Sequence, residues 1–273
     1  MQRIRTGLAL AVPAVLLILF APPWMTDAVI GVLILAAAWE WAALAGLQGS
    51  AARRTFVLCV ALTMGLAVYL AGPGRPGLQP LLLASGVGWA LAAVAVIAYP
   101  RGTTIWGSIP ARVFLGLCVL VPPWVAVLYL RSLTHGEWLL LFCIALIAFV
   151  DMGAFFSGRA FGGPKLMPRV SPAKTWSGFC GGVLASLALA VIAGLGAGME
   201  GESLQPWLWV CLLTALAAVV GDLLESMLKR FTGIKDSGSL LPGHGGLFDR
   251  LDSLTAGLPL FALGTFTAGG FVT

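Results

Sequence analysis

Apolar stretches almost free of charge follow one another along this chain, and a stretch of about 20 such residues crosses a bilayer as a helix. Only 10% of the 273 residues are charged, whereas ordinary soluble domains carry about 25%. We therefore predict an all-α fold, a polytopic integral membrane protein with about nine transmembrane helices. The expected spans are roughly 4–22, 28–47, 55–72, 81–100, 113–130, 139–158, 177–199, 207–229 and 251–272.

No other segment is long enough for a separate soluble domain, so residues 1–273 are expected to form one membrane domain. Within it, residues 1–130 supply the N-terminal helices. Residues 131–273 supply the helices and loops that hold most of the polar side chains, and we expect the chemistry there.

Basic residues indicate which ends of the spans face the cytoplasm. With the N-terminus inside, fourteen of the sixteen Lys and Arg residues fall in inner segments, and only Arg75 and Arg131 fall outside. This distribution obeys the positive-inside rule. We expect a multi-pass protein of the cell inner (plasma) membrane, with the polar segments 151–178 and 221–252 on the cytoplasmic face and the C-terminus outside. No basic run resembles a nucleic-acid patch, so no nucleic-acid partner is expected.

The segment 221–252 is densely polar in an otherwise apolar chain. Ionisable groups at a membrane are costly and mark functional sites. Its carboxylates suit a hard divalent cation, and its Lys and Arg side chains suit phosphates. Glycines at 243, 245 and 246 let the backbone approach a ligand closely. Together these features predict a site for a metal-bound polyphosphate.

One helical stripe at the end of the eighth span holds Asp222, Glu225, Ser226 and Lys229. Such a stripe must face protein or water rather than lipid. Glu225 and Lys229 are spaced i,i+4, so an internal salt bridge is an alternative to any catalytic role of Glu225. Asp222 has no basic partner nearby in the sequence, which favours a role with a metal or a proton.

The ninth span opens with Asp249 and Asp252 on one helical face. Acidic residues in a first turn also favour the helix macrodipole, which is the simpler interpretation. However, the stripe that carries Asp222 ends at the same membrane depth, so the two helices are expected to bridge a divalent cation. In the intervening linker, His244 is expected to donate to a phosphate or to hold the loop, with a general-base role as the weaker alternative.

A second polar constellation lies at 151–178, where Asp151 precedes four basic residues. For Arg159 and Arg169 a purely topological role stays open, because cytoplasmic loops are basic in any case. Lys174 lies beside the Ser171 and Thr175 hydroxyls, and residues 171–175 are expected to form a turn that leads into the next span. A lone carboxylate, Glu40, lies within the second span, and the sequence does not name its partner.

At these residues the chain resembles the phosphatidate cytidylyltransferases, also called CDP-diacylglycerol synthases, because every specified position of that family's signature is filled. The positions are Ser226, Lys229, Arg230, Lys235, Asp236, Gly238, Leu241, Pro242, His244, Gly245, Gly246, Asp249, Arg250 and Asp252. The upstream run SPAKTW at 171–176 is also similar to the family. Ser177 departs from it, since Glu is expected there in many members.

The resemblance implies transfer of CMP from CTP to phosphatidate, which gives CDP-diacylglycerol and pyrophosphate for phospholipid biosynthesis. Because the attacking phosphate is already anionic, such an enzyme must mainly supply positioning and charge neutralisation. The implied cofactor is Mg²⁺, held by Asp222 and Asp249, with a second cation left open. CTP, phosphatidate and membrane lipid are the expected partners, and a homodimer is compatible with the sequence.

Catalytic roles are expected for Asp222, Asp249, Lys229, Arg250 and Asp252. Substrate binding is expected for Ser171, Lys174, Thr175, Ser226, Arg230, Lys235, Asp236, His244, Gly245 and Gly246. Two other classes of membrane protein share some of these features. A polyprenol or dolichol kinase would share the metal and nucleotide requirements, and the signature does not specify the acceptor. A transporter usually shows internal repeats and midplane sites, whereas the charges here crowd one interface.

Overall fold

The computed structural model describes residues 12–238 and 245–268. Residues 12–20 are helical. The helices that follow are α2 (Pro23–Leu44), α3 (Ser50–Ala71), α4 (Leu78–Ala98), α5 (Thr103–Trp106), α6 (Ile109–Ser132), α7 (Gly136–Phe161), α8 (Trp176–Gly196), α9 (Leu204–Thr232) and α10 (Phe248–Thr267). Two short strands, β1 (Lys165–Met167) and β2 (Ser171–Thr175), lie between α7 and α8.

The prediction of an all-α polytopic membrane protein is confirmed. Among the described residues, seven helices are long and apolar enough to cross a membrane: α2, α3, α4, α6, α7, α8 and α9. The expected ninth span forms a helix, α10, which is not one of the seven and carries Asp249, Arg250 and Asp252 in its first turns. Of the first expected span, residues 4–11 lie outside the described part, and residues 12–20 are helical.

Large apolar side chains point outward on several of these helices. Leu62 on α3, Leu91 on α4 and Ile192 on α8 are each more than 60% exposed. Extensive exposed apolar surface marks a membrane-facing protein rather than a soluble one. The outward faces of these helices therefore suit contact with lipid.

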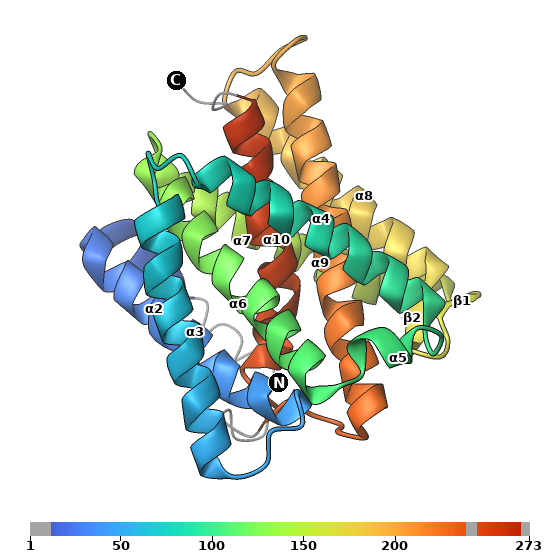
Figure 1. The fold of residues 1–273 in the computed structure, drawn as a ribbon. Coiled ribbons are helices and arrows are strands. Elements are labelled where there is room, and N and C mark those ends of the chain that lie inside the picture. The colour runs from blue at the N-terminus through green and yellow to red at the C-terminus, as the bar shows by residue number, and fades with distance from the viewer. Residues whose placement is uncertain (1–11, 239–244, 269–273) are drawn as a thin grey trace.

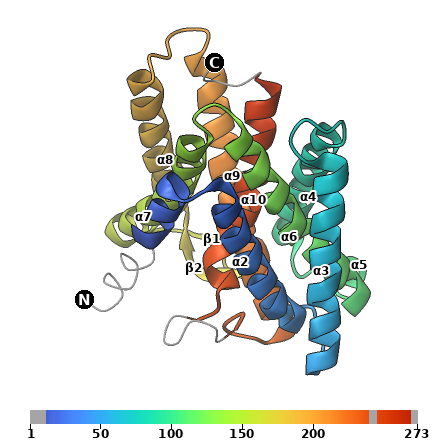
Figure 2. The same cartoon turned by 90° about the vertical axis from the view of Figure 1, so that its left-hand side faces the viewer.

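Helix α10 lies at the centre of the bundle (Figure 1), where it packs against α9, α6, α4, α7 and α2. Ala256, Phe261 and Ala262 on α10 are fully buried. Helix α2 lies beside the lower parts of α9 and α10 (Figure 2). Residues from both ends of the chain thus meet around α10.

Gly221 lets α9 and α10 approach closely just before the polar stripe. A Cβ atom at this position would lie 2.4 Å from the carbonyl oxygen of Asp252, which is backbone and cannot rotate away. The absence of a side chain at Gly221 therefore brings the next residue, Asp222, to the same level as Asp252. The close approach of these two helices is the feature of the fold that assembles the polar residues.

We expect Gly221→Ala to lower the free energy of unfolding by about 1–3 kcal/mol, because overpacking a tight contact forces the backbone apart. The matched control is Gly65→Ala on α3, where a Cβ atom would meet nothing within 4 Å. That change should be neutral or stabilising by up to about 1 kcal/mol, as Ala is the better helix former. Thermal melting of both variants in detergent checks the difference, and equal melting temperatures would contradict the tight contact.

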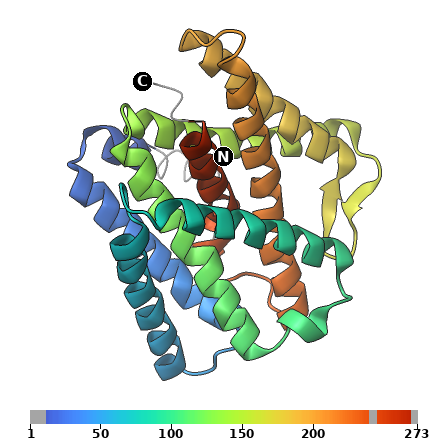
Figure 3. The same cartoon turned by 45° about the horizontal axis from the view of Figure 1, so that its top comes forward.

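The expectation of a turn at 171–175 is wrong, because these residues form strand β2. It pairs antiparallel with β1, with Lys165 opposite Thr175 and Met167 opposite Ser171. Proline lacks a backbone N–H but is tolerated on an edge strand, so Pro172 is compatible with this two-stranded hairpin. The hairpin connects α7 to α8 (Figure 3). The Thr175 hydroxyl then caps α8 by accepting the N–H of Gly178 at 3.1 Å.

Candidate active site

A lysine bridges α9 and α10 at their polar ends. The Lys229 ammonium lies 2.5 Å from Oε2 of Glu225 and 2.8 Å from Oδ1 of Asp249. The Glu225 side chain is 2% exposed and that of Asp249 is 14% exposed. The predicted Glu225–Lys229 salt bridge is therefore present, and it extends to α10. A cation between a buried and a partly buried carboxylate offsets the charge repulsion that would otherwise separate the helices.

The carboxylate of Asp249 also binds both ends of the linker that precedes α10. The Ser237 N–H donates to its two oxygens at 3.3 and 3.2 Å, and the Gly246 N–H donates to Oδ2 at 2.7 Å. Gly245 has a φ of 82°, a left-handed conformation that favours glycine. A Cβ atom there would lie 3.0 Å from Oδ2 of Asp249. These contacts fix the orientation of the Asp249 carboxylate.

A second ion pair joins the hairpin to α9. The ammonium of Lys174, on β2, lies 2.5 Å from Oδ2 of Asp222, and the Ser226 hydroxyl lies 3.4 Å from Oδ1. Asp151 on α7 and Asp252 on α10 are close enough for their charges to act on Asp222 and on Lys174. The interpretation that Asp222 lacks a basic partner is thus corrected. Its partner lies 48 residues earlier and comes from another element.

A cavity of about 420 Å³ opens beside this second pair. Its polar lining includes Asp151, Arg159, Lys174 and Asp222. Its apolar lining includes Val150, Ala154, Phe155, Leu166, Phe179 and Val219. A pocket lined by two basic side chains, two carboxylates and several apolar side chains suits a ligand with a phosphate and an apolar portion.

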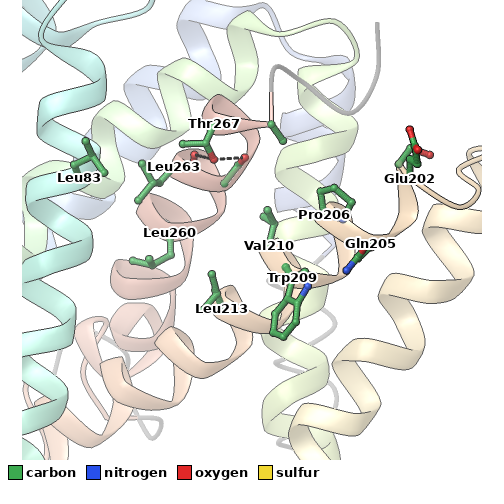
Figure 4. A pocket seen from close by; sticks show the side chains of 13 residues that line it. Leu83, Glu202, Gln205, Pro206, Trp209, Val210, Leu213, Leu260, Leu263 and Thr267 are labelled. Atoms are coloured by element: carbon green, nitrogen blue, oxygen red, sulfur yellow. Dashed lines mark hydrogen bonds between the residues drawn. The ribbon is translucent and has the colours of Figure 1, made fainter.

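A larger cavity, about 840 Å³, lies between α4, α9 and α10 (Figure 4). Leu83, Trp209, Leu213, Leu260 and Leu263 are among its mostly apolar lining residues. Along α9, 13 residues separate Trp209 from Asp222, which at 1.5 Å per residue is about 20 Å. We therefore place the candidate site at the smaller cavity, where the ionisable groups converge.

The other residues that the sequence analysis singled out lie around the same polar end. Arg230 donates from Nε to the Val170 carbonyl at 3.3 Å and so joins α9 to the hairpin. Lys235, Asp236 and Arg250 are exposed near the same end of the bundle. His244 lies outside the described residues. Ser177, where the chain departs from the family signature, donates to the Gly162 carbonyl and contacts the Thr175 hydroxyl.

Comparison with known proteins identifies the family. A model described as the cytidylyltransferase family matches residues 1–267. The chain belongs to this family. A protein of Pseudomonas aeruginosa named phosphatidate cytidylyltransferase is 41% identical over 240 residues, which cover 88% of this chain and 87% of that protein. The protein of that name from Haemophilus influenzae is 36% identical over 279 residues and 96% of each chain. Its namesake in Bacillus subtilis is 37% identical over 163 residues, covering 58% of this chain and 57% of that protein.

In this member of the cytidylyltransferase family, the carboxylates offer the hard oxygen ligands that Mg²⁺ prefers. Asp222 and Asp249 belong to the two different ion pairs, and each accepts from an ammonium. Across residues 12–238 and 245–268, no group of three or more His, Cys, Asp or Glu residues is arranged to hold a metal ion. Mg²⁺ usually binds one or two carboxylates together with substrate phosphates and waters. The two carboxylates therefore have the chemistry of ligands that Mg²⁺ uses together with phosphates.

Proposed function

We propose that this chain transfers CMP from CTP to phosphatidate, which yields CDP-diacylglycerol and pyrophosphate. The main support is the match of the cytidylyltransferase family over nearly the whole chain, with relatives of that activity at 41% and 36% identity. The paired lysine and carboxylate centres and the amphipathic cavity are the geometry that such a reaction requires. The relatives' name favours phosphatidate over a polyprenol as the acceptor.

The transfer forms one bond and breaks one. An oxygen of the phosphatidate phosphate bonds to the α-phosphorus of CTP, and the bond from that phosphorus to the bridging oxygen of the β-phosphate breaks. The nucleophile is already anionic, so the protein needs to supply orientation and charge neutralisation rather than a strong base. In this proposal Lys174 and Arg159 bind the lipid phosphate at the cavity, while Lys229 binds nucleotide phosphates.

Magnesium is the proposed cofactor, with Asp222 and Asp249 as its protein ligands and substrate phosphates as the rest of its shell. When bound there, it would neutralise phosphate charge and stabilise the leaving pyrophosphate. Both carboxylates supply the oxygen ligands that Mg²⁺ prefers, and the ammonium groups of Lys174 and Lys229 beside them can bind phosphates that complete the shell. A second cation and a homodimer stay predictions.

The direct test is incubation of the purified protein with CTP, phosphatidate and Mg²⁺, followed by detection of CDP-diacylglycerol. We expect product with phosphatidate, none with a polyprenol acceptor, and loss of turnover when EDTA removes the metal. Phosphorylated polyprenol as the product would move the chain to the kinase class. Turnover that persists in EDTA would show that the reaction does not need magnesium, while the proposed CMP transfer would still hold.

We further propose that the site faces the cytoplasm at the inner membrane. The positive-inside distribution supports this orientation, since Lys174, Lys229, Arg230 and Lys235 all lie at the same end of the bundle as the candidate site. A protease tag inserted within 239–244 should be cleaved only from the cytoplasmic side, in inverted membrane vesicles. A tag after residue 273 should be cleaved only from the opposite side. Cleavage of both tags from one side would show that α10 does not cross the membrane.

A further inference from the structure

Glu40 is a carboxylate of the N-terminal helices that reaches the candidate site. It lies on α2 and is 3% exposed. Its Oε2 atom accepts the backbone N–H of Phe248, the first residue of α10, at 2.7 Å. It also accepts the Ser237 hydroxyl at 3.3 Å. A carboxylate at the N-terminus of a helix is favourable. Glu40 therefore pairs the N–H of Phe248, which has no partner within the helix, and stabilises the start of α10.

Two glycines make room for this carboxylate. A Cβ atom at Gly238 would lie 2.2 Å from Oε1 of Glu40, and one at Gly246 would lie 2.6 Å from Oε2. Oε1 is buried and accepts no hydrogen bond from a described residue. Both ends of the linker therefore close around one buried side chain from a helix about 200 residues away in the sequence.

Ser237 connects Glu40 to Asp249. Its hydroxyl donates to Glu40 and accepts the Asp249 N–H at 3.3 Å, while its own N–H donates to the Asp249 carboxylate. Asp249 in turn binds Lys229. On the same turn of α2, the ring of Trp41 packs edge-on against that of Phe248, with centroids 5.1 Å apart. The position of Asp249 thus depends on α2 through both a hydrogen-bonded path and an aromatic contact.

We propose that Glu40 is a positioning residue for the CMP transfer. It holds residues 237–238 and 245–248 together and thereby fixes Asp249, the proposed metal ligand, and Lys229, the proposed phosphate binder. Glu40 itself is enclosed by the linker ends and α10 and does not touch the substrates. This inference rests on the proposed function, but the structural part of it can be measured without substrate.

The test compares Glu40→Gln, which keeps an oxygen acceptor of the same length, with Glu40→Leu, which keeps the bulk and removes the acceptor. In Glu40→Leu, kcat should fall about 10-fold or more, because a displacement of about 1 Å at a reacting group can cost 10²-fold. Glu40→Gln should stay within about 3-fold of wild type on the same reasoning. Hydrogen exchange of a peptide covering 236–250 should quicken in Glu40→Leu and not in Glu40→Gln.

Ser237→Ala removes the hydroxyl that connects Glu40 to Asp249. This variant tests the proposal if Glu40→Leu does not fold. It should quicken exchange at 236–250 and lower kcat. In the double variant with Glu40→Leu, the loss of kcat should be smaller than the two single losses combined, since both changes break one network. Thr26→Val is the control on α2, because it removes a hydrogen bond to the Leu17 carbonyl and should leave exchange at 236–250 and kcat as in wild type.

Wild-type exchange at 236–250 in both Glu40→Leu and Ser237→Ala would overturn the proposal. So would faster exchange with an unchanged kcat, because the linker would then be held without consequence for the reaction. If Thr26→Val changes exchange at 236–250 and kcat as Glu40→Leu does, the effect comes from general destabilisation of α2, and the proposal is overturned. Absence of CDP-diacylglycerol from the wild-type protein would instead sink the proposed function, while the exchange result would still stand.

Discussion

Asp222→Asn should lower turnover by about 10²-fold or more, because a group that stabilises transition-state charge typically contributes several kcal/mol. The melting temperature should barely change. The side chains of Asp222 and Lys174 are 29% and 27% exposed, and partly solvated ion pairs contribute only about 0–1 kcal/mol to stability. Loss of the charge also relieves repulsion from Asp151 and Asp252.

The matched control is Asp27→Asn. Asp27 pairs with Arg131, and its side chain is 28% exposed, nearly the same as that of Asp222. Asp27 lies at the opposite end of α2 from Glu40, so turnover should stay at the wild-type level. CMP transfer and thermal melting are measured for both variants. Wild-type turnover in Asp222→Asn, together with an inactive Glu225→Gln, would move the acidic centre from Asp222 to Glu225.

Lys229→Met should cost about 3–5 kcal/mol of stability, because removal of one partner from a buried ion pair leaves an uncompensated charge. Here two carboxylates, Glu225 and Asp249, would face each other without the ammonium between them. Turnover should also be lost, since the cation that binds phosphate in the proposed mechanism is gone. Thermal melting and CMP transfer, measured on the same preparation, report the two effects separately.

The double variant Lys229→Met with Glu225→Gln separates folding from catalysis. It removes one of the two unpaired charges, so it should melt several degrees above the single variant while turnover stays low. Recovery of wild-type turnover in the double variant would assign Lys229 a structural role only. If the single variant melts like the wild type, the ion-pair cluster of Glu225, Lys229 and Asp249 does not stabilise the fold.

Contacts within one helix, and most of the spans themselves, were predictable because they depend on residues that are close in the sequence. The i,i+4 spacing of Glu225 and Lys229 predicts a salt bridge on any α-helix, and the structure has it. Hydropathy likewise predicts most of the spans, since length and apolar character alone decide whether a helix can cross a bilayer. Residues 171–175 were not predictable in this way, because a short strand depends on a partner strand for its hydrogen bonds.

The sequence by itself determined the membrane-spanning class, the family signature and which two segments carry the polar residues. Beyond the Glu225–Lys229 pair within one helix, only the tertiary structure decided which of those residues meet. The Lys174–Asp222 pair joins residues 48 apart, and the contact of Glu40 with Phe248 joins residues 208 apart. The reason is geometric: hydropathy fixes where a helix begins and ends, but the rotation of each helix about its axis is set by packing, such as the contact at Gly221. That rotation decides which carboxylate faces which lysine.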